Sequence, residues 1–168
     1  MRRTIFWILL NLTITGLATA ASAGGGQDRE PVTITPFTLP ANRCAFPVHV
    51  EVVSNNEYQV VTTLADGTTI TNITGHLVLS FTNTVTGFTI VRNVSGPTTE
   101  TDYPDGSGTF VRHGENWWGF GPTSQHNTGE PGLVFTSGQV VLDIAGGAVT
   151  SFSLSGKLVN GCELLLGG

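Results

Sequence analysis

Two pairs of histidine and glutamate residues have the types and spacing for chemistry. His113 and Glu115 form one pair, and His49 and Glu51 form the other. Residues i and i+2 of a β-strand point to the same side, so each pair offers an imidazole and a carboxylate for metal binding or acid–base catalysis. The same spacing arises on a solvated sheet face, and Gly114 interrupts the first pair. We therefore favour the solvated-face interpretation for both pairs.

A further histidine lies in the polar segment 121–132, which is rich in Gly, Pro, Ser, Thr and Asn. This composition predicts a long loop that carries His126 and Glu130. Ligand contacts are often made by such loops, so His126 is a candidate ligand-binding residue. Contact with water explains a polar loop equally well, and we favour that explanation.

Acidic residues gather at Glu100, Asp102 and Asp105. Glu100 and Asp102 alternate onto one strand face, an arrangement found in glycosidases and calcium sites. Asp105 is explained by the turn that contains it. We expect Glu100 and Asp102 to lie on an exposed edge strand, where charges oppose pairing with other sheets.

Adjacent tryptophans are the most informative aromatic feature. Neighbouring strand residues face opposite sides, so we expect one tryptophan in the core and the other on the surface or at a barrel mouth. An exposed ring would stack on a sugar or line an apolar cavity, and the alternative is a ring that covers the end of the core. The candidate ligand-binding residues are therefore Trp117, Trp118, His113, Glu115, Tyr103 and His126.

The chain lacks the local signatures of common catalytic sites. It contains no Gly-x-Ser-x-Gly elbow, no His-Glu-x-x-His motif and no phosphate-binding glycine loop. Cys44 and Cys162 lack the close spacing of zinc ligands. We assign no catalytic residue, and we expect no metal and no cofactor.

Strands are the elements that must position these residues. Val, Ile, Thr and Phe dominate 42–168, apolar residues alternate with period two, and no long segment has helical periodicity. Hairpins are expected at the turns 66–67, 83–87 and 104–108, with further strands at 133–135, 140–144 and 149–158. About eight to ten short antiparallel strands follow from this spacing, as in β-barrels and β-sandwiches.

The two cysteines bear on the choice between these folds. Cys44 and Cys162 are the only cysteines, and they lie near the two ends of the folded part. In an exported chain they are expected to form one disulfide, which brings the first and last strands together. Our predicted fold is an all-β antiparallel barrel closed by this disulfide, with a β-sandwich as the alternative.

The N-terminal segment predicts export. Arg2 and Arg3 precede an apolar run over 5–20, and small residues follow up to an expected cleavage site after Ala23. The run is shorter than the roughly 20 apolar residues of a membrane span. We expect a signal peptide over 1–23, a flexible leader over 24–41, a single all-β domain over 42–168, and a secreted, extracellular product without a membrane span after cleavage.

Charge narrows the range of partners. Without residues 1–23 the chain keeps five basic and twelve acidic residues, a net charge of −7. The five basic residues are scattered along the chain, whereas nucleic-acid binding needs a clustered basic surface. We therefore exclude nucleic acids and anionic membranes as partners.

Several strand-end and turn motifs resemble those of small exported proteins of high-GC Gram-positive bacteria. The motifs lie between Cys44 and Cys162 and include Asp66-Gly67, Thr74-Gly75-His76-Leu77, Phe81-Thr82-Asn83, Asn93-Val94-Ser95-Gly96-Pro97 and Pro104-Asp105-Gly106-Ser107. The resemblance covers nearly the whole mature chain. It implies a bacterial secreted protein and supplies no activity or catalytic residue.

Three kinds of function are compatible with these observations. We favour a secreted, non-enzymatic β-domain that binds a small apolar molecule, a glycan or a protein partner. The first alternative is a hydrolase or cyclase-like enzyme that uses His113, Glu115 and His126 at a barrel mouth. The second is a structural cell-surface protein without a ligand.

Overall fold

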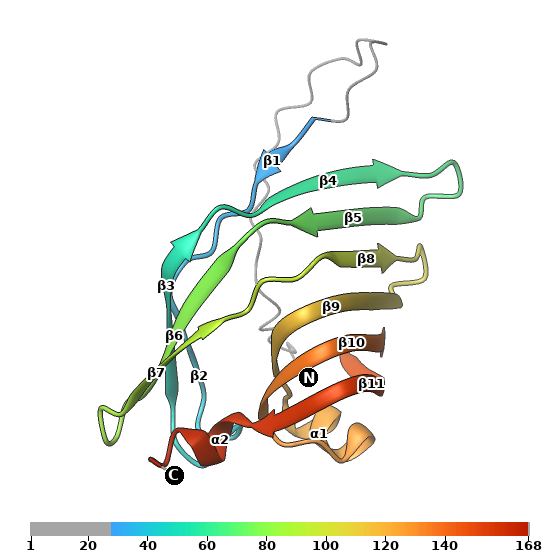
Figure 1. Ribbon diagram of the computed structural model, residues 1–168. Coiled ribbons are helices and arrows are strands. Elements are labelled where there is room, and N and C mark those ends of the chain that lie inside the picture. Colours follow the sequence, from blue (N-terminus) through green and yellow to red (C-terminus); the bar gives the residue numbers. More distant parts are fainter. Residues whose placement is uncertain (1–27, 168) are drawn as a thin grey trace, which may run out of the picture.

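Two antiparallel β-sheets make up the computed structural model, which describes residues 28–167 (Figure 1). This part of the chain contains eleven strands and two short helices. The predicted all-β class is therefore confirmed. The predicted signal peptide and its cleavage site lie outside the described residues.

The larger sheet has seven strands in the order β1-β4-β5-β8-β9-β10-β11. Its hairpins β4–β5 and β8–β9 form at the turns predicted from the sequence. The strands are β1 (Glu30–Pro31), β4 (Tyr58–Thr63), β5 (Thr69–Thr74), β8 (Thr98–Asp102), β9 (Gly108–Gly119), β10 (Leu133–Ala145) and β11 (Ala148–Asn160).

The smaller sheet has four strands in the order β2-β3-β6-β7, which are β2 (Phe37–Leu39), β3 (Val48–Asn55), β6 (Leu77–Asn83) and β7 (Thr89–Asn93). Within residues 28–167 neither sheet closes on itself, because β1 and β11 end the larger sheet and β2 and β7 end the smaller one. The predicted closed barrel is not confirmed. The structure shows two separate sheets instead.

The main core lies where the smaller sheet packs against β9 and β10. Phe81 of β6 is fully buried and meets Trp117 and Phe135 edge-on, with ring centroids 5.5 and 4.9 Å apart. Phe37 of β2 stacks on Trp117, with ring centroids 5.9 Å apart. Aromatic contacts of this kind bury large apolar areas and so hold the two sheets together.

Three glycines lie side by side where the larger sheet bends. Gly138 of β10 pairs with Gly114 of β9 on one side and with Gly156 of β11 on the other. A Cβ on Gly138 would collide with the carbonyl oxygen of Ser155 in the next strand. We call this line the glycine crease. The expectation that separate strands flank Gly138 is wrong, because glycine lets β10 continue through the bend.

The chain passes between the two sheets at the level of the crease. The connections β3–β4 and β5–β6 are two residues long, 56–57 and 75–76, and the β7–β8 connection covers the four residues 94–97. Figure 1 shows the resulting curvature, with β2, β3, β6 and β7 grouped to one side of the larger sheet. The strands of the two sheets therefore separate from one another along the glycine crease.

Two segments differ from expectation. Residues 28–41, expected to belong to a flexible leader, include β1 and β2, which pair with β4 and β3. The expected loop 121–132 contains the helix α1 (Pro122–Thr128), which ends at Gly129 in the left-handed conformation. Proline at the helix start and glycine at its end are helix signals that the polar composition obscured.

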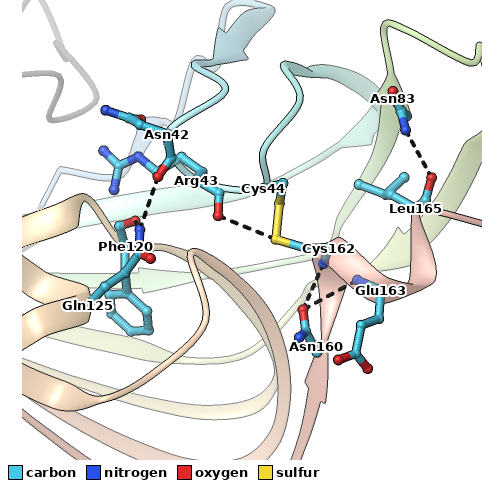
Figure 2. The surroundings of a disulfide bond; sticks show 10 residues. All are labelled: Asn42, Arg43, Cys44, Asn83, Phe120, Gln125, Asn160, Cys162, Glu163 and Leu165. Carbon is cyan, nitrogen blue, oxygen red and sulfur yellow. Dashed lines mark hydrogen bonds between the residues drawn. A yellow bond between two sulfur atoms is a disulfide. The ribbon is translucent and has the colours of Figure 1, made fainter.

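The predicted disulfide between Cys44 and Cys162 is present (Figure 2). It joins the segment before β3 to the short helix α2 (Gly161–Leu164), whose N-terminal amides are capped by the side chain of Asn160. Nearby, the Asn83 side chain of β6 donates to the carbonyl oxygen of Leu165 at 3.2 Å. The disulfide therefore fastens the smaller sheet to the end of β11.

Removing the disulfide is expected to destabilise the protein strongly. The bond closes a separation of 118 residues. For a loop of this length, the double change Cys44→Ser and Cys162→Ser should lower the free energy of unfolding by about 4 kcal/mol, as measured by urea denaturation. The wild-type protein under a reducing agent is the control and should lose a similar amount. A loss below about 1 kcal/mol would contradict this role of the disulfide.

Candidate functional site

The strand register defines a surface that runs from polar to apolar side chains. Opposite residues on antiparallel neighbours share one side of a sheet. On the side opposite to Trp117 and Phe135, two rows cross β8, β9, β10 and β11. We call this surface the arginine face. Its first row consists of Thr98, Arg112, Val140 and Leu154. Its second row consists of Glu100, Phe110, Leu142 and Phe152.

Arg112 lies at the border between the polar and apolar ends of this face. Its guanidinium carbon lies 4.6 Å from the centre of the Trp118 ring. The Trp118 ring is itself buried, and its Nε1 donates to Oγ1 of Thr136 at 3.3 Å. A guanidinium over an indole ring is a favourable cation–π arrangement.

The bend at the glycine crease makes this contact possible. Arg112 and Trp118 are six residues apart on β9, which is about 20 Å along a straight strand and too far for two side chains to bridge. Gly114 lies between them with a φ of +81°, a conformation that residues with a Cβ rarely adopt. The arginine face is therefore concave at the crease.

The guanidinium of Arg112 has unused hydrogen-bonding capacity. Its Nε is buried without a hydrogen-bond partner, and within residues 28–167 no hydrogen bond or ion pair joins the Arg112 side chain to another residue. Burial lowers the pKa of Arg112, while the charges of Glu100 and Glu57 oppose this shift. Since arginine remains protonated, the site holds a cation whose donors are available.

Glu100 is the carboxylate next to this cation. Its pKa is raised to about 7, first by burial and then by the negative charge of Asp102, against a smaller lowering effect of Arg112. Burial also raises the pKa of Glu57, which lies in the β3–β4 connection, while Arg112 and His76 lower it. Both carboxyl groups therefore take up protons more readily than exposed glutamates do.

The expected position of Glu100 and Asp102 on an edge strand is wrong. β8 lies inside the larger sheet, between β5 and β9. The two carboxylates do share one strand face, as the alternation predicts, since Asp102 acts on Glu100 electrostatically. The edge was mistaken because strand order depends on pairing between distant segments, which local patterns do not encode.

Arg112 is the candidate site residue that sequence reasoning missed. A signal was present, because Arg112 alternates with Phe110 on one side of β9. A charged residue in an apolar row is uncommon unless it has a partner or a function. The bend at Gly114, which unites Arg112 with Trp118, could not be inferred from alternation alone.

The two tryptophans face opposite sides of β9, as predicted, yet both pack into apolar clusters. Trp117 packs in the main core, and Trp118 packs in a second cluster with Phe120, Val134 and Val140. The expectation that one ring is exposed is wrong, because the larger sheet buries side chains on both of its faces. Trp118 has a polar neighbour in Arg112, whereas Trp117 meets aromatic rings.

The other predicted site residues do not form a cluster. His113 and Glu115 are exposed on β9, Tyr103 is exposed in the β8–β9 turn, and His126 is exposed on α1. In the described part of the chain, no hydrogen bond, ion pair or ring contact joins these four residues to one another. The His49 ring is hydrogen-bonded to Thr38.

A small cavity adjoins the crease on the side of the smaller sheet. Its volume is about 110 Å³, and its lining includes Arg92 of β7, Glu115 of β9 and Lys157 of β11. The Arg92 guanidinium lies 5.5 Å from the centre of the Phe135 ring. Glu115 therefore borders a hollow, although this hollow is separate from the arginine face.

Comparisons with protein-family models, with curated proteins and with solved structures gave no match. Among the described residues, no helix has both the length and the apolar character needed to cross a membrane. Residues 28–167 also contain no group of three or more His, Cys, Asp or Glu side chains placed to hold a metal ion.

Substituting Gly114 should separate Arg112 from Trp118. Gly114→Ala adds a Cβ at positive φ, 3.1 Å from the carbonyl oxygen of Ser95. Gly87→Ala is the matched control, because its φ is also positive but nothing lies within 4 Å of the added carbon. Both changes should cost about 1–2 kcal/mol of conformational strain, and Gly114→Ala should cost at least about 1 kcal/mol more.

The readout for this pair of variants combines urea denaturation with the NMR signal of the Trp118 indole N–H. Gly114→Ala should shift this signal, and Gly87→Ala should leave it unchanged. Equal destabilisation and an unchanged indole signal in both variants would show that the bend does not create the contact.

The raised pKa of Glu100 predicts how stability depends on pH. The folded protein binds a proton at Glu100 up to about pH 7, whereas an unfolded chain releases it near the ordinary pKa of about 4.5. Stability contributed by this group is therefore present below the unfolded pKa and is lost as the pH rises through 7. Glu100→Gln should become more stable relative to wild type by roughly 3 kcal/mol between about pH 4.5 and pH 8, because one pKa unit corresponds to about 1.4 kcal/mol.

Chemical denaturation at several pH values measures this difference. Glu115→Gln, which removes a negative charge from an exposed position on β9, is the control for the change in net charge. A constant difference between Glu100→Gln and wild type across this range would contradict the raised pKa.

Proposed function

We propose that this chain is a secreted, non-enzymatic β-domain that binds a small molecule with an apolar body on the arginine face. The observation that carries the proposal is the guanidinium of Arg112, which lies over Trp118 with a buried Nε that has no hydrogen-bond partner. A buried polar group without a partner is costly, and a ligand that accepts its hydrogen bonds removes that cost.

The apolar end of the arginine face supports a ligand with an apolar body. Val140 and Leu142 are buried there, and Phe110, Phe152 and Leu154 are half-buried around them. The half-buried rings and branched side chains retain apolar area that a ligand can cover. Small-molecule sites commonly combine such an apolar lining with a few polar groups that fix the orientation of the ligand.

A glycan or a protein partner is less well supported by the same geometry. Sugar binding would use an exposed aromatic ring, but Trp118 is only 8% exposed and its indole N–H is already bonded to Thr136. The exposed Tyr103 lies in a turn, and no ring contact joins it to either tryptophan in the described residues. These observations favour the small apolar molecule among the partners expected from the sequence.

Acid–base catalysis is a second candidate, and one observation favours it. Glu100 has a pKa of about 7, which suits a residue that exchanges protons near neutral pH. The cluster expected for an enzyme, His113, Glu115 and His126, is not joined by any contact in the described residues. We rank binding first because, in the described residues, no hydrogen bond or ion pair joins Glu100 to a histidine of that cluster.

Stability in the presence of ligands tests the proposed function. The mature protein, residues 24–168, is screened for a rise in unfolding temperature with aliphatic amphiphiles, simple sugars and divalent metals. A ligand at 100 times its dissociation constant stabilises the folded state by about 2.7 kcal/mol. We expect a rise with amphiphiles, and we expect Arg112→Gln to weaken binding by about tenfold, corresponding to the loss of one charged hydrogen bond.

Arg92→Gln is the matched control, because Arg92 also lies over an aromatic ring but faces the smaller sheet. It should leave amphiphile binding unchanged. A rise with sugars alone would favour the glycan alternative. No rise with any compound would contradict binding of a small molecule and favour a structural role.

A further inference from the structure

We propose that the ligand of the arginine face is an anionic amphiphile, whose acidic head group binds Arg112 and whose alkyl body extends toward β11, and that it binds together with a proton taken up at Glu100. This inference rests on the proposed function. It adds the chemical class of the ligand and a dependence of its binding on pH.

The position of Arg112 supports an acidic head group. Its guanidinium is fixed over Trp118, and within residues 28–167 its donors are not used by any hydrogen bond or ion pair. Arginine binds carboxylate and phosphate oxygens through a planar pair of N–H donors. Because the ring already covers one face of the guanidinium, the head group approaches along its edge.

The two rows of the arginine face support an alkyl body. Next to Arg112 the first row continues through Val140 to Leu154, and the second row continues through Leu142 to Phe152. From β9 to β11 these rows span about 10 Å, since neighbouring strands are about 4.8 Å apart. An extended alkyl chain of moderate length covers this distance while its head group remains on Arg112.

The balance of charge explains why a proton accompanies the anion. The charges that act on Glu100 are those of Asp102 on its own strand and Arg112 on β9. Arg112 also interacts with the Glu57 carboxylate, and Glu57 with His76 of the β5–β6 connection. The residue of β5 that pairs with Glu100 is Thr71, which carries no charge. With all three carboxylates ionised, their negative charge offsets Arg112 and repels a further anion.

Protonation of Glu100 removes one of these negative charges and creates an O–H donor beside the guanidinium. A bound anion in turn favours the protonated form, so binding and proton uptake reinforce each other. The pKa of Glu100, raised to about 7 by burial, places this step near neutral pH. Affinity for the anion should therefore fall as the pH rises above 7.

The first experiment uses unmodified mature protein and two probes of equal chain length, dodecanoate and dodecanol. Isothermal titration calorimetry at about pH 6 and about pH 8.5 measures both affinities. If binding raises the pKa of Glu100 by one unit, dodecanoate should bind roughly five- to tenfold more weakly at the higher pH. Dodecanol should bind more weakly than dodecanoate at the lower pH and show no such dependence.

Two variants assign the effects to individual groups. Glu100→Gln keeps the shape of the protonated side chain, so its dodecanoate affinity should be the same at both pH values and close to the wild-type affinity at the lower one. Arg112→Gln should abolish the preference for dodecanoate over dodecanol, and Arg92→Gln should retain it. Near-ultraviolet circular dichroism establishes that each variant is folded, and the wild-type comparison of the two probes requires no variant.

The outcomes separate this inference from the proposed function. Equal binding of dodecanoate and dodecanol would overturn the acidic head group but leave binding of an apolar body intact. A preference for dodecanoate without pH dependence would overturn the role of Glu100. If neither probe binds, the proposed function fails together with the inference.

Discussion

The close approach of backbones at the glycine crease is the constraint on which the rest of the structure depends. At Gly138 and Gly156 the carbonyl group of the neighbouring strand occupies the space that a Cβ would need. Side chains at these positions would separate β10 from β11 and straighten the larger sheet. With glycine there, one sheet can pack against the smaller sheet near one end and curve away from it beyond the crease.

Because of this curvature, the side chains on the two faces of β9 make different kinds of contact. On one face Trp117 fills the space between the sheets and meets Phe37 and Phe81. On the other face the Trp118 ring lies against the guanidinium of Arg112. Arg112 is charged and incompletely hydrogen-bonded, which costs stability. The main core offsets this cost, and such a combination is common at binding sites.

Electrostatics connects the local geometry with the proposed binding of an acid. Without residues 1–23 the chain carries a net charge of −7, which disfavours anions over most of its surface. Arg112 is half-buried beside carboxyl groups whose pKa values burial raises. Protonation of these groups makes the local charge less negative, and the proposed pH dependence of anion binding rests on this change.

The sequence by itself determined the strand class, the hairpins and the disulfide, because period-two alternation, turn residues and a single pair of cysteines are local or compositional signals. It also placed Trp117 and Trp118 on opposite sides of one strand. It did not identify Arg112, and it assigned Glu100 to an edge strand, since strand order and bending depend on contacts between segments far apart in the chain. Only the tertiary structure decided that β8 is an interior strand and that a bend at Gly114 brings Arg112 onto Trp118, because long-range pairing and backbone crowding create these contacts.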